Sequence, residues 1–424
     1  MSFLGRTFTS LGRRDFRRYF AGHVTSVVGF WIRIVIQGWL VYELTGSRTL
    51  LGAVTAASLL PLVLLSPVGG LLGDRVDRRS ILLWTPLVAV AGNATLGVLV
   101  ILGSIQVGHI FVVAVVIGAA RAIEIPVRNA FVRDVVGLEN LGNAIALNAA
   151  GFNVARVVGP ALGAVLLKVI GMGPCFLVAA AAQGAMTVAL LGIHAPSSQP
   201  TRPSGSPVQQ LAEGLRYVRG HRRTRTLIML LAITILFTWT YQTVMAAFAK
   251  DRLGLDESGY SLLTSVPGVG ALVGALWVAG RMGRVRPRRG LVSGLVWGGA
   301  AAVFLLGLVH QVGWAIPGLV AVGFCQVGFM ASANAMVQES VPDALRSRVM
   351  GLWVFTFGLC FPVGAMLQGL VSQATSLTVT WSGGAVMTLL LSLVVWLTLP
   401  RRSAARAPPA EVVPEASLTD SPPA

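Results

Sequence analysis

The chain alternates between apolar stretches and short connectors that hold most of its charge. A helix needs roughly 20 apolar residues to cross a membrane, and twelve stretches meet that requirement. Only 12% of the residues are charged, against about a quarter in a soluble domain. The sequence therefore predicts an all-α membrane protein with twelve transmembrane helices. We place these helices at about 20–44, 48–73, 80–103, 108–130, 141–169, 172–194, 224–249, 257–280, 288–309, 313–338, 346–372 and 376–399.

Basic residues gather in every second connector. By this division roughly 26 of the 33 Lys and Arg fall on one side, and the positive-inside rule makes that side cytoplasmic. We therefore expect both the N- and C-termini in the cytoplasm, and a multi-pass protein of the cell inner (cytoplasmic) membrane. The formal net charge of +17 is explained by connectors that face lipid headgroups, so we expect no nucleic-acid partner.

One segment occurs twice, about 205 residues apart. Residues 129–136 match residues 334–341, and the match continues without a gap to Gly159 and Gly364. A repeat of this length in hydrophobic sequence predicts two six-helix halves built to one plan. Many secondary transporters have this plan and hold their substrate between the halves.

Composition divides the chain into five parts. We predict a cytoplasmic N-terminal segment (1–19), an N-terminal six-helix half (20–194), a cytoplasmic linker (195–223), a C-terminal six-helix half (224–400) and a disordered cytoplasmic tail (401–424). The linker begins proline-rich and then places apolar residues on one helical face and arginines on the other. This pattern predicts a short helix on the membrane surface. The proline-rich tail has a composition typical of disorder.

The loop between the second and third predicted helices combines glycine with dense charge. It contains Gly70, Asp74, Arg75, Arg78 and Arg79. A carboxylate at the membrane surface can cap another helix or pair with an arginine in one conformation and release it in another. We therefore predict a gating loop. The alternative is a charged turn that only sets topology.

This loop resembles the signature loop of the major facilitator superfamily, Gly-x-x-x-Asp-Arg-x-Gly-Arg-Arg, although Asp77 stands where many members have glycine. Four further segments, at 39–47, 126–130, 143–148 and 346–351, look like the branch that contains the bacterial enterobactin exporter. The resemblance covers nearly the whole chain and implies rocker-switch alternating access.

The resemblance also implies roles for two groups of residues. Asp74 would help to close the cytoplasmic side by contacting the start of helix 11, near Arg346. On helix 5, Gly159, Pro160 and Gly163 look like the Gly-Pro motif of drug and proton antiporters. Small residues at such a position let helices pack closely and bend. The alternative for this motif is a packing site without a transport role.

Two arginines fall deep inside predicted helices. Arg33 lies about ten residues, or roughly 15 Å, from either end of the first helix, which is too far for an arginine to snorkel. Arg156 is similarly deep in the fifth helix. We predict that both face a substrate cavity. The alternative is a structural arginine bonded to backbone carbonyls or to a neighbouring helix.

Glu124 is the one carboxylate that we place inside a predicted helix and away from its ends. Arg121 and Arg128 share its face of the helix. Proton-coupled transport needs a buried group that is protonated in one state and paired in another, so Glu124, Arg121 and Arg128 are the candidates for proton coupling. The alternative is a permanent ion pair. We place none of the five histidines at a coupling position.

The resemblance implies a cavity lined mainly by helices 1, 4, 7 and 10. In addition to Arg33 and Arg156, its predicted lining consists of Gln37, Trp239, Tyr241, Gln242, Gln326 and Asn334. Such side chains suit a small amphipathic or anionic organic substrate. Trp239 and Tyr241 have the alternative of packing or interface residues.

Motifs for chemistry are missing from the sequence. It contains no metal-ligand cluster, no Gly-x-Ser-x-Gly and no nucleotide-binding loop. We therefore expect no enzyme activity, no cofactor, no metal and no drive by ATP hydrolysis. The three cysteines lie in apolar stretches without a partner at ligand spacing, so we expect them to be buried small apolar residues.

These features together predict a monomeric secondary active transporter. It would export a small organic molecule of the siderophore, drug or secondary-metabolite class by proton antiport. Its partners would be this substrate, protons and the lipid bilayer. An importer or facilitator is the alternative. A non-transporting membrane sensor is a weaker one, because the linker and tail are too short to form a sensor domain.

Overall fold

The described chain is helical almost throughout. The computed structural model describes residues 9–193, 207–282 and 289–398, without the side chains of 66–75, 207–208, 210, 281–282 and 344, and no strand occurs in these ranges. The longer helices are α2 (Arg14–Thr45), α3 (Arg48–Arg75), α4 (Arg78–Ile101), α5 (Val107–Ile170), α6 (Met172–Leu191), α7 (Pro207–Gly220), α8 (Arg222–Phe237), α10 (Glu257–Met282), α11 (Arg289–Leu306), α12 (Val312–Ser340), α13 (Asp343–Ala374) and α14 (Leu377–Thr398). The short elements are η1 (Thr9–Gly12), η2 (Trp239–Val244), α9 (Met245–Ala247) and η3 (Phe248–Arg252).

Eleven segments of the described chain are long and apolar enough to cross a membrane. One of them, α5, has 64 residues, which is about 96 Å of helix, against about 30 Å of hydrocarbon core. Gly137 interrupts α5 with a φ of 73° and a ψ of 170°, a positive-φ conformation that glycine adopts without a steric penalty. The connector that we expected at 131–140 is therefore helix on both sides of one glycine. With α5 counted as two spans, the described chain is a multi-pass membrane protein with twelve spans.

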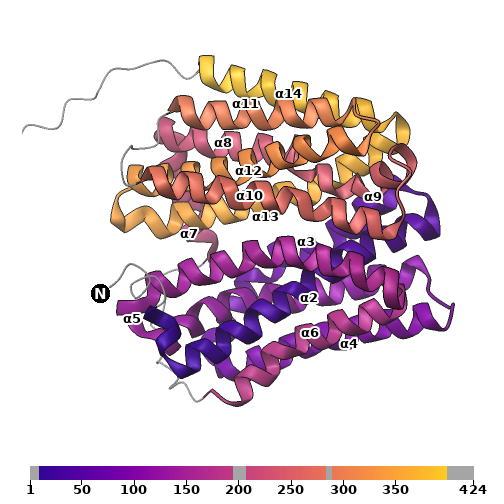
Figure 1. Cartoon of the computed structure of the whole chain (residues 1–424). Coiled ribbons are helices and arrows are strands. Elements are labelled where there is room, and N and C mark those ends of the chain that lie inside the picture. Colours follow the sequence, from indigo (N-terminus) through magenta and orange to yellow (C-terminus); the bar gives the residue numbers. More distant parts are fainter. Residues whose placement is uncertain (1–8, 194–206, 283–288, 399–424) are drawn as a thin grey trace, which may run out of the picture.

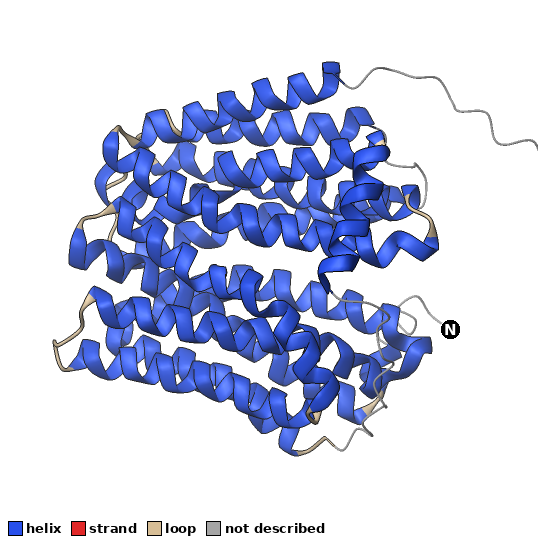
Figure 2. Ribbon diagram, turned by 180° about the vertical axis from the view of Figure 1, so that it is seen from behind, coloured by secondary structure: helices blue, strands red, loops and turns tan. Residues whose placement is uncertain are grey.

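The helices form two groups, which Figures 1 and 2 show from opposite sides. Helices α2 to α6 pack against one another, and so do α8 to α14. We call these sets the N-terminal group and the C-terminal group. Between the groups, α3 lies against α13 and α5 lies against α10. Helix α7 lies against α13 of the C-terminal group, so the short helix expected in the linker is present.

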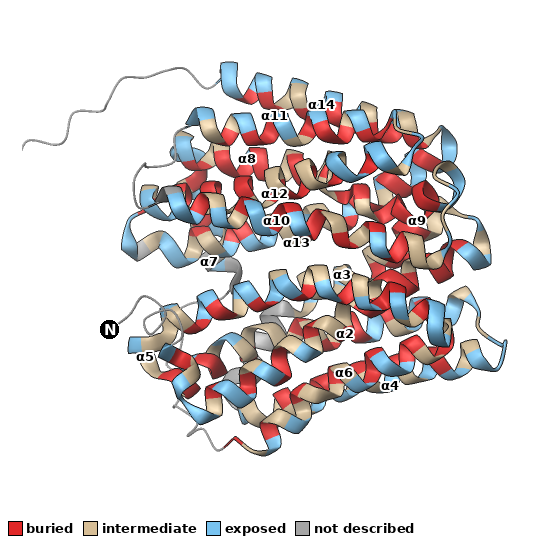
Figure 3. Ribbon diagram, viewed as in Figure 1, coloured by how far each residue is buried: buried red, intermediate tan, exposed pale blue. Residues whose placement is uncertain are grey.

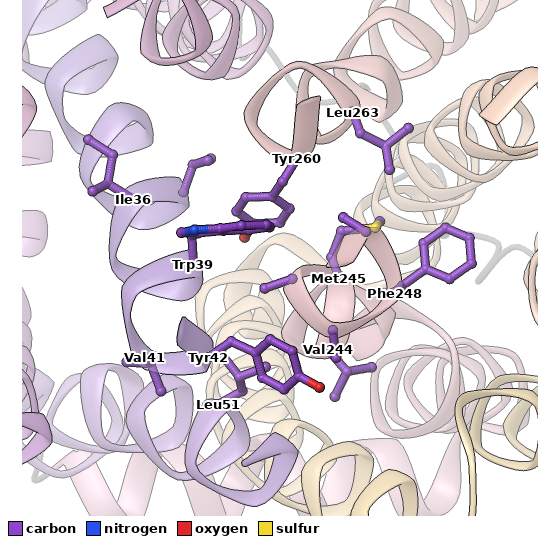
Figure 4. Close-up of a cluster of buried hydrophobic side chains, with 14 of the residues drawn as sticks. Ile36, Trp39, Val41, Tyr42, Leu51, Val244, Met245, Phe248, Tyr260 and Leu263 are labelled. Carbon is purple, nitrogen blue, oxygen red and sulfur yellow. The ribbon is translucent and has the colours of Figure 1, made fainter. Parts of the chain in front are cut away.

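The buried cores are arranged unequally along the helices. The largest cluster contains residues of both groups, including Trp39 and Tyr42 from α2 and Phe248 and Tyr260 from the C-terminal group (Figure 4). The rings of Trp39 and Tyr260 lie 5.5 Å apart between their centroids. The two other clusters each belong to a single group, one to α2, α4, α5 and α6 and the other to α7, α8 and α11 to α14. The groups therefore share a core at one end only, which we call the closed end.

Many large apolar side chains are exposed on the outside of the molecule. Trp84 is 70% exposed and Leu276 is 66% exposed, and exposed positions recur along the outermost helices α4 and α14 (Figure 3). Soluble monomers rarely expose such continuous apolar surface. The surface is suited to contact with lipid chains.

The two copies of the sequence repeat have similar burial at their centres. Phe131 and Val132 are buried in the first copy, as are Met336 and Val337 in the second. The residues that follow, Arg133 and its counterpart at 338, are both exposed. The copies therefore occupy corresponding positions, at the C-terminal ends of the α5 half before Gly137 and of α12.

Candidate functional site

The residues Trp239, Tyr241 and Gln242 lie in an irregular part of the span predicted at 224–249. Regular α-helix ends at Phe237, and Trp239–Val244 continues as the 3-10 helix η2 before α9 and η3. We expected an unbroken helix over 224–249. The hydroxyls of Thr234, Thr238 and Thr240 donate hydrogen bonds to carbonyls of the preceding turn. Such bonds compete with the helix ladder and bend helices, and short 3-10 stretches inside helices often mark functional hinges.

Neighbouring helices support this irregular segment. Gln368 of α13 donates a hydrogen bond of 3.1 Å to the carbonyl of Phe237, where regular helix ends. Gly364 and Gly384 let α13 and α14 approach closely, since an added Cβ would lie 2.8 Å from the carbonyl of Leu236 and 2.6 Å from that of Phe237. Among these three residues, the sequence points only to Gly364, as the end of the repeat. An amide and two glycines in apolar helices carry no signal until their neighbours are known.

Arg33 is enclosed in the N-terminal group. Its side chain is only 2% exposed, and it donates a hydrogen bond to Gln37, one turn further along α2, which is also buried. Its Nε has no hydrogen-bond partner. The guanidinium of Arg121 lies 3.8 Å from the centroid of the Phe30 ring, and that of Arg33 lies 5.5 Å from the same ring. Two positive side chains therefore share one aromatic ring.

Arg156 lies on the second part of α5 and faces the C-terminal group. Its guanidinium is 5.8 Å from the ring centroid of Trp31, and its charge acts on Tyr241. Tyr241 is fully buried, with its ring edge-on to Trp381 at 6.0 Å, and Gln242 donates a hydrogen bond of 3.3 Å to its hydroxyl. Tyr241 is thus packed tightly, as its alternative role requires, and the backbone of Arg156 lies beside Gly268 of α10 in the C-terminal group.

Glu124 is bonded to only one of its two predicted partners. Its carboxylate accepts a hydrogen bond of 2.8 Å from Arg128, one turn along α5. Arg121 has no hydrogen bond to Glu124 and lies over Phe30 instead. His23 is buried, with 6% of its surface exposed. It lies within electrostatic reach of Arg128 and Arg121.

His23 did not belong to the expected site. We placed the start of the first helix at residue 20, whereas α2 begins at Arg14. The additional turns place His23 further from the start of the helix, and its ring stacks on that of Tyr19 at 5.7 Å.

The remaining cavity candidates lie apart from the arginines. Trp239 and Gln326 line one pocket inside the C-terminal group, between α8, η2, α11 and α12, and the Trp239 ring is edge-on to Phe357 at 5.8 Å. Asn334 accepts a hydrogen bond of 2.5 Å from Gln338, one turn along α12. Gln326 therefore faces a pocket inside its own group rather than the N-terminal group.

The loop between α3 and α4 is held within the N-terminal group. Asp77 caps α4 by accepting a hydrogen bond of 2.9 Å from the backbone of Ser80. Arg78 forms an ion pair of 2.8 Å with Asp134 of α5, and Arg79 donates hydrogen bonds to carbonyls at the end of α6. These bonds explain one of the two aspartates of the loop as a local helix cap.

Part of the predicted gating contact lies outside the described side chains. The side chains of Gly70, Asp74 and Arg75 are among those that the structure does not describe. Arg346, the expected contact of Asp74, is half exposed and forms an ion pair of 2.6 Å with Asp343 in the first turn of α13. The contact between Asp74 and the start of α13, near Arg346, stays a prediction.

The Gly-Pro motif of α5 lies where three helices meet. A Cβ added to Gly159 would come within 2.5 Å of the Cβ of Trp31 on α2. The carbonyl of Pro160 accepts a hydrogen bond of 2.7 Å from Ser261 of α10, and Gly163 lies against the same serine. The motif therefore joins α2 and α5 and also contacts the C-terminal group.

A set of polar bonds joins the groups at the closed end. Asp251 of η3 accepts hydrogen bonds from the hydroxyl of Tyr42 at 2.5 Å and from the guanidinium of Arg48 at 2.8 Å. The guanidinium of Arg48 also donates to the backbone carbonyl of Ser372, and its backbone N–H donates to the side-chain oxygen of Gln373. We call Tyr42, Arg48 and Asp251 the clasp. Its members are far apart in sequence, so spacing could not reveal it.

Known proteins resemble the chain along almost its whole length. A family described as "Transmembrane secretion effector" matches residues 6–421. The multidrug efflux pump Tap of Mycobacterium tuberculosis is 27% identical over 409 residues, which cover 91% of this chain and 94% of the pump. Macrolide efflux protein A of Streptococcus pyogenes is 23% identical over 371 residues, which cover 84% and 89%.

Solved structures share the fold. A mutant form of the nucleoside transporter NupG superimposes with a TM-score of 0.74 at 12% sequence identity, over 91% of this chain and 99% of that one. The narrower resemblance to the enterobactin exporter branch stays a prediction. With a family match that runs from residue 6 to residue 421, the protein belongs to the transmembrane secretion effector family and is a transporter of the major facilitator superfamily rather than an enzyme.

Proposed function

We propose that this protein exports a small organic molecule, of the drug or secondary-metabolite class or of the siderophore class, by alternating access. The observation that carries the proposal is the unequal packing of the two groups, which share a core and the clasp at one end and have separate cores at the other. A transporter that works by alternating access has this form in one of its two states.

The two groups then correspond to two six-helix halves joined by a cytoplasmic linker at 195–223. With both termini in the cytoplasm, as the distribution of basic residues predicts, the closed end lies on the outer face. The conformation is then open toward the cytoplasm. Residues 1–19 and 401–424 would be the cytoplasmic ends of the chain, and the halves would extend over 20–194 and 224–400.

The clasp would open when the transporter turns outward. Tyr42 and Arg48 belong to the N-terminal group and Asp251 belongs to the C-terminal group, so outward opening separates these partners. Asp74 and Arg346 would then close the cytoplasmic side, as the signature loop implies. Each end of the molecule thereby has its own polar contact between the halves.

Proton antiport is the proposed drive. Glu124 with Arg128 is the pair that would alternate between a protonated and a paired form. Direction is supported by the relatives, since Tap and macrolide efflux protein A are named for efflux. An importer or facilitator is the second candidate, and it would work without Glu124.

The deciding experiment compares a strain that lacks this protein with one that carries it, by untargeted mass spectrometry of cells and medium. Export predicts at least one compound that is retained in cells without the protein and secreted with it. A compound that instead disappears from the medium only when the protein is present would reverse the direction. The antiport proposal would then be withdrawn as well.

A further inference from the structure

Three arginines in the membrane-spanning part of the N-terminal group have no carboxylate partner. They are Arg33, Arg121 and Arg156, and none of the ion pairs among the described residues includes them. The carboxylate of this region, Glu124, is bonded to Arg128. The region therefore has an excess of positive charge within the part of the chain that the structure describes.

Two of these arginines lie at the ends of a short row of aromatic rings on α2. The guanidinium of Arg121 lies 3.8 Å from the Phe30 centroid, the Phe30 and Trp31 centroids are 5.5 Å apart, and the guanidinium of Arg156 is 5.8 Å from that of Trp31. All four side chains are partly accessible. Arg33 is enclosed near Phe30. We call Phe30, Trp31, Arg121 and Arg156 the arginine–aromatic strip.

A charge in a membrane interior is costly unless another charge or a full set of hydrogen bonds compensates it. Ring faces supply only part of that compensation. Guanidinium groups are suited to oxyanions, because they donate two parallel hydrogen bonds to a carboxylate, phosphate or sulfonate group. The unpaired arginines therefore point to a negatively charged ligand.

We infer that the arginine–aromatic strip is the substrate site and that it binds an organic oxyanion. The apolar body of the substrate lies against Phe30 and Trp31, and its anionic group is bound by Arg121 or Arg156. Arg33 adds positive potential next to them without direct contact. The inference rests on the proposed function, since it names the chemical class that is exported. It also separates Arg121 from the proton-coupling pair, to which sequence spacing had assigned it.

The test uses the purified full-length protein in lipid nanodiscs and a matched pair of probes, 2-naphthoate and the uncharged 2-naphthamide. Isothermal titration calorimetry measures both affinities. We expect naphthoate to bind at least about tenfold more tightly than the amide. Charge-assisted hydrogen bonds usually raise the affinity by about this factor. Equal affinities, or binding of neither probe, would overturn the inference. This comparison needs no variant and so does not depend on how substitutions fold.

Variants then locate the site. Arg121→Gln should weaken naphthoate binding about tenfold and leave the amide unchanged, and Arg121→Lys should retain part of the affinity because it keeps the charge. The matched control is Arg133→Gln, which removes a charge from an exposed position further along α5. If Arg133→Gln weakened naphthoate binding as much as Arg121→Gln, the attraction would come from overall charge, and the strip would not be the site.

The export comparison of whole cells separates this inference from the proposed function. Export of a neutral or cationic compound would overturn the anion class and leave export standing. Selective binding of naphthoate together with unchanged metabolite profiles would support the strip and count against export.

Discussion

Arg48 and Asp251 form an ion pair of 2.8 Å between α3 and η3, and thereby bond the N-terminal group to the C-terminal group. Their side chains are 22% and 34% exposed, so water screens the pair and its contribution is about 1 kcal/mol at most. Its importance lies in its position, since each partner belongs to a different group of helices.

The first prediction concerns this pair. Asp251→Asn should weaken the closed end and shift the balance of states toward the outward-open form, by about fivefold for a loss of about 1 kcal/mol. Spin labels placed on the two groups at the closed end would report the shift as longer distances. Asp256→Asn is the control, because the side chain of Asp256 accepts a hydrogen bond from the nearby backbone of Gly259, within the same group. Unchanged distances in the Asp251 variant would remove the clasp from the mechanism.

A second prediction addresses proton coupling. Glu124→Gln should flatten the pH dependence of efflux, because the amide cannot take up or release a proton. Transport in proteoliposomes, measured with and without a pH gradient, is the readout. Glu139→Gln is the matched control on the same helix at an exposed position. A pH dependence that persists in the Glu124 variant would remove Glu124 from proton coupling.

The third prediction tests the signature loop. Asp74→Asn should lower the transport rate while leaving the amount of protein in the membrane unchanged, since the loop keeps its arginines. Asp77→Asn is the comparison, because Asp77 caps α4 and asparagine caps helices about as well as aspartate, so this change should cost less than about 1 kcal/mol of stability. Transport assays and membrane expression levels are measured together. Normal flux in the Asp74→Asn variant would reduce the loop to a topology signal.

The fourth prediction concerns the close approach of α2 and α5. Gly159→Val should destabilise the purified protein by about 1–3 kcal/mol, because the new side chain overlaps Trp31. Gly142→Ala is the control on the same helix, since a Cβ there meets no atom within 4 Å. Thermal unfolding followed by circular dichroism checks both variants. Equal unfolding temperatures would show that the two helices can separate without cost.

Much of the fold follows from the sequence, because membrane spans can be recognised by their length and apolar composition. The apolar stretches located the helices, and the repeat at 129–136 and 334–341 corresponds to two helix ends with similar burial at their centres. Helix ends were less accurate. Charged residues at 131–140 suggested a loop, whereas the backbone of Gly137 alone turns the chain between two helices.

The site was harder to predict, since it depends on contacts between distant residues. Spacing brought Glu124 and Arg128 together correctly, because neighbours one turn apart meet on any helix. The same rule failed for Arg121, which lies over a ring from α2 instead. The clasp could not be found from spacing, and no hydrophobic pattern distinguishes the 3-10 segment η2 from regular helix.

The geometry of η2 has a mechanical consequence. A 3-10 helix rises about 2.0 Å and turns about 120° per residue, whereas an α-helix rises about 1.5 Å and turns about 100°. Rewinding the six residues of η2 as α-helix would shorten the span from α8 to η3 by about 3 Å. It would also rotate everything beyond η2 by about a third of a turn. Asp251, which lies beyond η2, would be carried around the helix axis and away from Tyr42 and Arg48. A small change of winding in mid-membrane is thus geometrically sufficient to undo a bond at the membrane surface.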